Sequence, residues 1–299
     1  MATVREALRA DIAGARRAVR AVAARAGTAD LLTFFVFVPL VLLAVEAAVR
    51  AGGPLTRVDR ALFRFPVTAD GLARPDLVAR AFVSSYAHHG LAHLATNLVT
   101  YLVGAGSLYG VAVRVHHRRE ARQVLTVACL GAPFAVAWGT LASPVGSTAV
   151  GFSGVVAAVL GALPVMLFAA AAVHAPVGVD PRWSAPPVFS VIAAVAVIGG
   201  LPDWVWVTTA ASSLAVTVLL CRDRGHGTVV RGIVPLVRYR HPFVMAGTLV
   251  TTAGVGLLFF SVGPNTNVTG HLAGFCLGYA VALVLVTRRR RLRRHRRRW

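Results

Sequence analysis

The chain has 299 residues, of which 57% are apolar and only 14% are charged, and its mean hydropathy is +0.69. This composition excludes an ordinary soluble protein and indicates an integral membrane protein. The formal net charge of +20 comes from 31 arginines without a single lysine, and they lie between the long apolar runs rather than on one soluble face. The charge therefore favours contact with anionic lipid headgroups over binding to nucleic acid.

The long apolar runs predict transmembrane helices, because about 20 apolar residues are needed to cross the hydrocarbon core as a helix. A basic N-terminal segment, 1–30, precedes them, and its residues 4–26 predict a helix lying on the inner leaflet. An Arg-rich tail, 288–299, follows them. The expected spans are 31–49, 92–113, 124–142, 151–173, 188–201, 204–221, 243–262 and 270–287.

The distribution of arginine decides the expected topology, since positive charge marks the cytoplasmic side. Arginine gathers in 1–30, 114–122, 222–242 and 288–299, whereas the connections 143–150, 202–203 and 263–269 contain none. Both termini are therefore expected to be cytoplasmic, and counting the short run 188–201 as a crossing gives the required even number, eight. The long loop 50–91 is expected outside despite its arginines, with 57–65 lying flat in the interface. We thus expect an all-α polytopic protein of the cell membrane with a transmembrane domain over 31–287.

Few ionisable groups lie inside the expected spans, and such groups are functional candidates because they are costly in lipid. Glu46 lies near the outer end of the first span, where we expect it to reach the headgroups. His93 and His271 lie within spans, and His88 and His89 lie at the entrance of one. The three cysteines are expected to be small buried hydrophobes rather than a disulfide or a metal knuckle: Cys129, Cys221 and Cys276.

Three spans that run inward from the outer face carry polar residues in their first two turns. These residues are His93 with Asn97, Ser153, and His271. At about 1.5 Å of rise per residue, all of them are expected within roughly 10 Å of the outer face. Glycines predict close packing of these helices, because they let backbones touch in lipid. They are Gly151 and Gly154 around Ser153, and Gly270, Gly274 and Gly278 along the last span.

The chemistry of these groups predicts a nucleophilic site. A serine hydroxyl needs a neighbouring base, usually a histidine, to take its proton, and attack on a carbonyl builds an oxyanion that needs donors. Ser153 lies near a helix N-terminus, where unsatisfied N–H groups favour an oxyanion. His93 and Asn97 are spaced i, i+4 and share one helix face. Since no carboxylate is expected near His271, the arrangement is a Ser–His dyad rather than a triad.

Two other functions remain open. His89 and His93 at i, i+4, with His88 beside them, would suit a transition metal in a transporter or a metalloenzyme. The residues between them include no glutamate, so the H-E-x-x-H pattern is missing. The other alternative is a non-catalytic membrane scaffold that holds the transmembrane helices of partner proteins.

Taken together, the motifs resemble those of the rhomboid family of intramembrane serine proteases. They are "HHGLAHLATN" at 88–97, "GFSG" at 151–154 and "GHLAGFCLG" at 270–278. The resemblance covers about 85–287 in motif order. It implies a helical fold with a water-filled cavity open to the outer face, and cleavage of transmembrane protein substrates near their outer ends without a metal or cofactor.

The resemblance also implies a role for each site residue. It makes Ser153 the nucleophile and His271 the general base, with the oxyanion bound by the Ser153 backbone and the side chains of His93 and Asn97. Gly151 falls where the family needs a tight turn, and His88 matches a histidine that supports the cavity.

The chain departs from the family pattern in four ways. Three expected spans, within 188–262, lie between the serine and histidine helices where the family has one. Ala157 stands where many relatives carry a tyrosine that packs on the base, and Gly270 stands where alanine is usual. The loop 50–91 lacks the family's common tryptophan. These departures bear on substrate choice and rate more than on the dyad.

Overall fold

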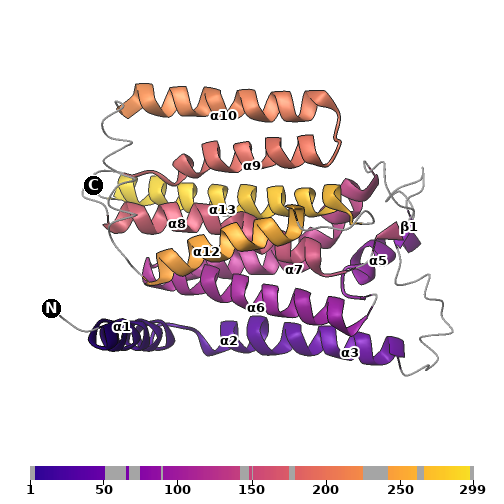
Figure 1. Cartoon of the computed structure of the whole chain (residues 1–299), viewed down its shortest axis with the longest axis horizontal. Helices are drawn as coiled ribbons and strands as arrows, with labels where there is room; N and C mark the ends of the chain where they lie inside the picture. The colour runs from indigo at the N-terminus through magenta and orange to yellow at the C-terminus, as the bar shows by residue number, and fades with distance from the viewer. Residues whose placement is uncertain are drawn as a thin grey trace.

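The computed structural model describes residues 4–50, 65–66, 75–88, 90–141, 148–149, 151–174, 179–224, 242–260 and 266–296, which are mostly helical (Figure 1). The first half contains α1 (Val4–Ala23), α2 (Thr28–Leu32), the π-helical turn η1 (Thr33–Phe37), α3 (Val38–Arg50), α5 (Pro75–Ser84), α6 (Leu91–Arg114) and α7 (Arg118–Leu141). The second half contains α8 (Ser153–His174), the 3-10 turn η3 (Pro181–Ser184), α9 (Ala185–Ile198), α10 (Asp203–Arg224), α12 (Pro242–Val255), the π-helical turn η4 (Gly256–Phe260) and α13 (Val268–Arg296). Two short strands pair antiparallel, β1 (Phe65–Pro66) and β2 (Thr148–Ala149).

The described helices are those of a multi-pass membrane protein. Six of them are long and apolar enough to cross a bilayer: Thr28–Arg50, Leu91–Arg114, Arg118–Leu141, Ser153–Val173, Pro181–Ile198 and Val268–Arg289. Shorter apolar stretches lie in Val207–Leu220 and Met245–Phe260. The all-α polytopic fold expected from the sequence is therefore confirmed, and each of the eight expected spans corresponds to a helix.

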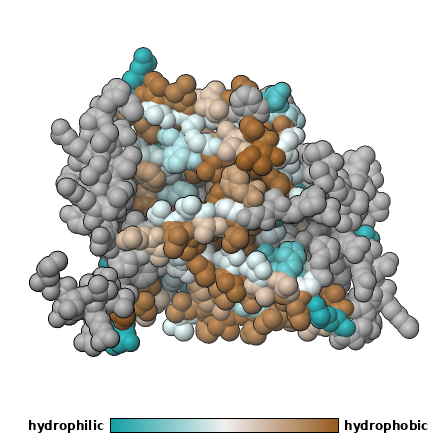
Figure 2. Space-filling model, viewed as in Figure 1, coloured by the Kyte–Doolittle hydropathy of each residue, from teal (hydrophilic) through white to brown (hydrophobic). Residues whose placement is uncertain are grey.

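The surface of the bundle is apolar along its middle, as a lipid-facing surface must be. Brown, hydrophobic residues make up much of the face shown in Figure 2, mixed with white ones of intermediate hydropathy, and most of the strongly teal residues lie toward its edges. Leu249 is 69% exposed, Leu214 67% and Val284 61%. Exposure of such side chains is unfavourable in water but not against lipid acyl chains. The amphipathic helix α1 lies at one end of the bundle and is seen nearly along its axis, whereas the spans run across the view (Figure 1).

Helix α8 forms the centre of the bundle. It packs against α6, α7, α12 and α13, and most of its side chains are fully buried. Its sequence is apolar on every face and rich in alanine and valine, which is the pattern of a helix surrounded by others.

The contact between α8 and α13 is close because small residues face backbone. A methyl group added at Gly274 would overlap the carbonyl of Gly154, and one at Gly278 would overlap the carbonyl of Ala158. From the other side, Gly161 faces the carbonyl of Phe275 in the same way. The close packing expected from the glycine spacing is present, and it fixes the distance between the two helices.

Helices α9 and α10 form a hairpin at the edge of the bundle (Figure 1). Phe189 of α9 makes an edge-to-face contact with Tyr279 of α13, with ring centroids 6.3 Å apart. The Ser184 hydroxyl lies 3.4 Å from the hydroxyl of the same tyrosine. The chain then returns, and α12 packs on α6 and α8. The α9–α10 hairpin therefore lies outside the central packing of α8 with α6, α7, α12 and α13.

Buried carboxylates form hydrogen bonds and ion pairs between helices at the end of the bundle where α7 begins. Asp30, which is 3% exposed, accepts hydrogen bonds from the Tyr109 hydroxyl at 2.8 Å and from Arg118 Nε at 2.7 Å. Glu120, 5% exposed, accepts one from Arg289 at 2.6 Å. These pairs tie the first span to α6 and α7, and α7 to α13.

Glu46 differs from the sequence expectation. It is 3% exposed and forms an ion pair of 2.8 Å with Arg50, one turn later on the same helix. We expected it to reach the headgroups, but helix packing covers it, and the adjacent arginine partly balances its charge.

We predict that Gly278→Ala lowers the free energy of unfolding in mixed micelles by about 1–3 kcal/mol, because the added methyl group separates α8 from α13. The matched control is Gly106→Ala in α6, where a methyl group would meet Phe35 at an ordinary 3.8 Å. Titration of the folded protein with denaturing detergent measures both. Equal stability of the two variants would contradict the proposed role of the contact.

Candidate active site

Ser153 and His271 meet across the α8–α13 contact. The Ser153 Oγ lies 2.7 Å from His271 Nε2, although 118 residues separate them in sequence. Each stands in the first turn of its helix, just before the glycine that brings the helices together. His271 is 7% exposed, so its ring is enclosed by the bundle. A serine hydroxyl and an imidazole at this distance form the pair that nucleophilic catalysis needs.

The other ring nitrogen of His271 is held by main chain. Its Nδ1 lies 3.1 Å from the carbonyl oxygen of Leu258, and the ring of Phe259 packs edge-on at a centroid distance of 6.3 Å. Because a carbonyl can only accept, Nδ1 carries the proton and donates it. Nε2 then presents its lone pair to the Ser153 hydroxyl, which is the tautomer of a general base.

Both Leu258 and Phe259 belong to the π-helical turn η4, which extends α12. Single π-helical turns displace the backbone from the regular ladder and occur often at functional sites. Here the turn brings a carbonyl and an aromatic ring to the histidine. No side chain marks this contact in the sequence, since a carbonyl belongs to the main chain and is present at every residue.

The turn before Ser153 depends on Gly151. Its φ is +124°, a conformation that residues with a side chain rarely adopt. Its N–H donates to the carbonyl of Ser84 at 2.9 Å, which fixes the turn against the end of α5. Ser153 then begins α8, where the first N–H groups have no partner within the helix and the dipole is positive.

His93 and Asn97 face this turn from α6. A methyl group placed on Gly151 would lie 2.9 Å from His93 Cε1 and 3.9 Å from Asn97 Nδ2. Asn97 is 5% exposed, and its Nδ2 has no hydrogen-bond partner among the residues that the structure describes. A buried amide donor without a partner costs about 1–3 kcal/mol. Asn97 Nδ2 is therefore placed to donate a hydrogen bond to an acceptor bound beside the turn of Ser153.

His88 contacts the same turn. The Phe152 N–H points toward His88 Nε2 at 3.5 Å, and the His88 ring meets His93 edge-on at a centroid distance of 5.2 Å. The structure thus brings His88, His93 and Asn97 to the residues that precede Ser153. His89 lies outside the described residues.

Gly154 and Ala157 complete the wall of α8 behind the serine. A methyl group on Gly154 would overlap Val136 of α7, so a glycine is needed for α8 to fit between α7 and α13. Ala157 is fully buried. The small residue at this position is therefore enclosed by its neighbours.

Asn267, which the sequence reading did not single out, holds the start of α13. Its Oδ1 accepts from the Gly270 N–H at 2.9 Å and from the Thr269 hydroxyl at 3.1 Å, which makes it the helix N-cap. Its Nδ2 donates to the Thr140 hydroxyl near the end of α7. Asn267 therefore caps the first turn of α13, which carries His271, and also links this turn to α7.

Comparison of the chain with models of known protein families, with curated proteins and with solved structures finds no match. The site is accordingly described by its own geometry. Within the ranges that the structure describes, no group of three or more His, Cys, Asp or Glu residues is placed to hold a metal ion. Of the residues considered for a metal, His88 and His93 lie beside the turn of Ser153.

We predict that Asn267→Ala speeds amide hydrogen exchange over 268–272, because loss of an N-cap costs about 0.5–2 kcal/mol of local stability. Asn267→Asp is the matched variant, since its carboxylate keeps the acceptor for the Gly270 N–H. Exchange measured by mass spectrometry in detergent should be fast in the first variant and near wild type in the second. Unchanged exchange in Asn267→Ala would show that other contacts hold this turn.

Proposed function

We propose that the protein is an intramembrane serine endopeptidase that hydrolyses peptide bonds of transmembrane protein substrates. The observation that carries the proposal is the 2.7 Å contact between Ser153 Oγ and His271 Nε2, with the histidine oriented by a carbonyl on its far side. Pairing with an enclosed imidazole is the arrangement of a nucleophile and its base.

In the proposed reaction, Ser153 Oγ attacks the carbonyl carbon of the scissile bond while His271 Nε2 takes the hydroxyl proton. The tetrahedral intermediate then collapses, the C–N bond breaks, and the same proton passes to the leaving amine. A water molecule attacks the resulting acyl-enzyme with His271 again as base, releasing the acid and restoring the serine. No carboxylate takes part, so the machinery is a dyad.

The oxyanion of each tetrahedral state needs donors at the turn before α8. Asn97 Nδ2 supplies one, since it is buried and has no partner among the described residues. The backbone N–H of Ser153, at the start of α8, is the second donor that we assign, and the helix dipole adds positive potential. His93, whose ring lies against Gly151, is the third group that we assign to this hole.

The resemblance to the rhomboid family supports the same assignment. The packing of α12 on α6 and α8, with the α9–α10 hairpin outside it, accounts for the additional spans as an appendage to a six-helix core. Helix α10 has 22 residues, or about 33 Å, which is enough to cross. We therefore propose eight spans with both termini cytoplasmic, the dyad near the outer face, and substrates cut near their outer ends.

The decisive prediction concerns Ser153. A fluorophosphonate probe should label the detergent-solubilised wild-type protein, and Ser153→Ala should abolish that labelling. Ser213→Ala is the matched control, since its hydroxyl lies 3.0 Å from Ser190 in the α9–α10 hairpin, away from the dyad. His271→Ala should lower the labelling rate by at least about 10³-fold, because the base is lost.

Two outcomes of this experiment would overturn the proposal. Labelling that survives in Ser153→Ala would place the reactive serine elsewhere. A folded wild-type protein that is never labelled and cuts no co-expressed single-span substrate would leave the scaffold function instead. Elemental analysis of the same sample tests for the metal alternative.

We predict that Asn97→Ala lowers kcat by up to about 10²-fold with little change in KM, because the donor acts on the oxyanion formed after binding. Thr96→Ala is the matched control, since its hydroxyl bonds back to the Ala92 carbonyl at 2.9 Å on the exposed face of α6. Cleavage kinetics of a reconstituted substrate measure both. Loss of folded protein, rather than of rate, in Asn97→Ala would make Asn97 structural.

A further inference from the structure

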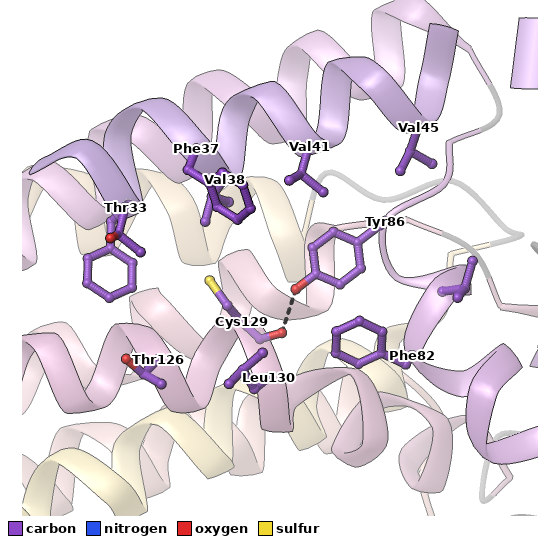
Figure 3. A pocket seen from close by; sticks show the side chains of 12 residues that line it. Thr33, Phe37, Val38, Val41, Val45, Phe82, Tyr86, Thr126, Cys129 and Leu130 are labelled. Carbon is purple, nitrogen blue, oxygen red and sulfur yellow. Dashed lines mark hydrogen bonds between the residues drawn. The ribbon is translucent and has the colours of Figure 1, made fainter. Parts of the chain in front are cut away.

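A groove of about 420 Å³ lies between the first span and α7, and residues of α5 and the turn after it close one end of it (Figure 3). Its lining is almost wholly apolar. Cys129 contributes its thiol, and its carbonyl accepts a hydrogen bond of 2.6 Å from the Tyr86 hydroxyl, so that hydroxyl is already satisfied. The side chains that form the walls include Phe37, Val41, Val45, Phe82 and Leu130.

The opposite end of the groove is polar. Thr33 on the first span and Thr126 on α7 both line that end, away from Tyr86 and Val45 (Figure 3). One turn further along the same two walls come Asp30 on the first span and Arg122 on α7. Because residues three or four apart share a helix face, these charges lie on the same sides of the two helices as the end of the groove.

These charges belong to a second pocket of about 730 Å³ that is rich in arginine. It is lined by Arg25, Arg118, Arg119, Arg122 and Arg289, together with His116 and Asp30. Asp30 is engaged by Arg118, and Arg289 is engaged by Glu120. Five arginines against these two carboxylates leave an excess of positive charge. The Arg122 side chain is 53% exposed, with its Nη1 at 4.0 Å from Asp30.

The depth of this basic pocket matches the headgroups of the leaflet opposite the dyad. Arg289 follows His271 by eighteen residues on α13, which is about 27 Å of helix, close to the thickness of the hydrocarbon core. The groove itself extends from Thr33 to Val45, about 18 Å along the first span. That exceeds the depth of one leaflet, about 15 Å.

We propose that the groove and the basic pocket together form a binding site for one anionic phospholipid. The phosphate contacts Arg119 and Arg122, and one acyl chain lies in the groove between the first span and α7. A zwitterionic lipid would add a cation to a pocket that already has excess positive charge, so an anionic headgroup is favoured. A free phosphate would leave the apolar groove uncovered. This site is separate from the proposed dyad and does not depend on it.

Native mass spectrometry of the full chain, delipidated in detergent, tests the proposal. Phosphatidylglycerol and phosphatidylcholine with identical acyl chains are titrated separately. We expect one phosphatidylglycerol to bind about tenfold or more tightly than phosphatidylcholine, since each arginine near a phosphate contributes about 1 kcal/mol. Equal affinity for the two lipids would overturn the proposal.

Matched variants test the two halves of the site. The double variant Arg119→Gln, Arg122→Gln should weaken phosphatidylglycerol binding by about 10- to 30-fold, whereas Arg222→Gln, at an exposed arginine of α10, should not. Leu130→Trp, which fills the groove, should weaken it too, whereas Leu249→Trp on the lipid-facing side of α12 should not. Loss of phosphatidylglycerol binding in either control variant would overturn the proposed site. Unchanged binding in both site variants would overturn it too.

Soluble glycerol 1-phosphate serves as the competitor. It should displace the lipid only weakly, because it has no acyl chain. Full displacement at comparable concentration would mean that the pocket binds phosphate alone, and it would overturn the assignment of the groove.

Discussion

The close contact between α8 and α13 is the constraint on which the rest of the site depends. Lipid supplies no hydrophobic force between two apolar helices, so their distance is set by how nearly the backbones can approach. Gly274 and Gly278 let the carbonyls of α8 lie against α13. Ser153 precedes this contact on one helix and His271 precedes it on the other, so the spacing of their side chains follows from the backbone contact.

Features that depend on local pattern could be predicted from the sequence. Length and hydropathy located the helices well, although α7 begins six residues before the expected 124 and the apolar helix Pro181–Ile198 begins seven residues before the expected 188. Depth along three inward-running spans predicted that Ser153, His271 and Asn97 would be neighbours, and the structure places Ser153 against His271 and Asn97 beside the turn before it. Neither inference required knowledge of distant contacts, because the membrane fixes the direction and depth of each helix.

Features that depend on the main chain or on distant partners could not be predicted. The carbonyl of Leu258 orients His271, but it leaves no mark in the side-chain sequence, and the π-helical turn that presents it has no compositional signal. Asn267 lies in a connection without hydrophobic periodicity, so the sequence pattern did not indicate its role at the start of α13. Asp30 and Glu120 are buried because they pair with residues 88 and 169 positions away, and a single sequence does not show such pairs.

Polar groups are accommodated differently at the end of the bundle where α7 begins and around the Ser153–His271 pair. At the end where α7 begins, carboxylates are buried only as ion pairs, and the remaining arginines lie where headgroups can solvate them. At the dyad, the groups assigned to chemistry are a hydroxyl, an imidazole and an amide, all neutral in the resting state. A carboxylate behind His271 would be a buried charge that needs its own partner, whereas the Leu258 carbonyl orients the ring without one. A Ser–His pair without a carboxylate would therefore avoid an additional buried charge at the depth at which the reaction is proposed to occur.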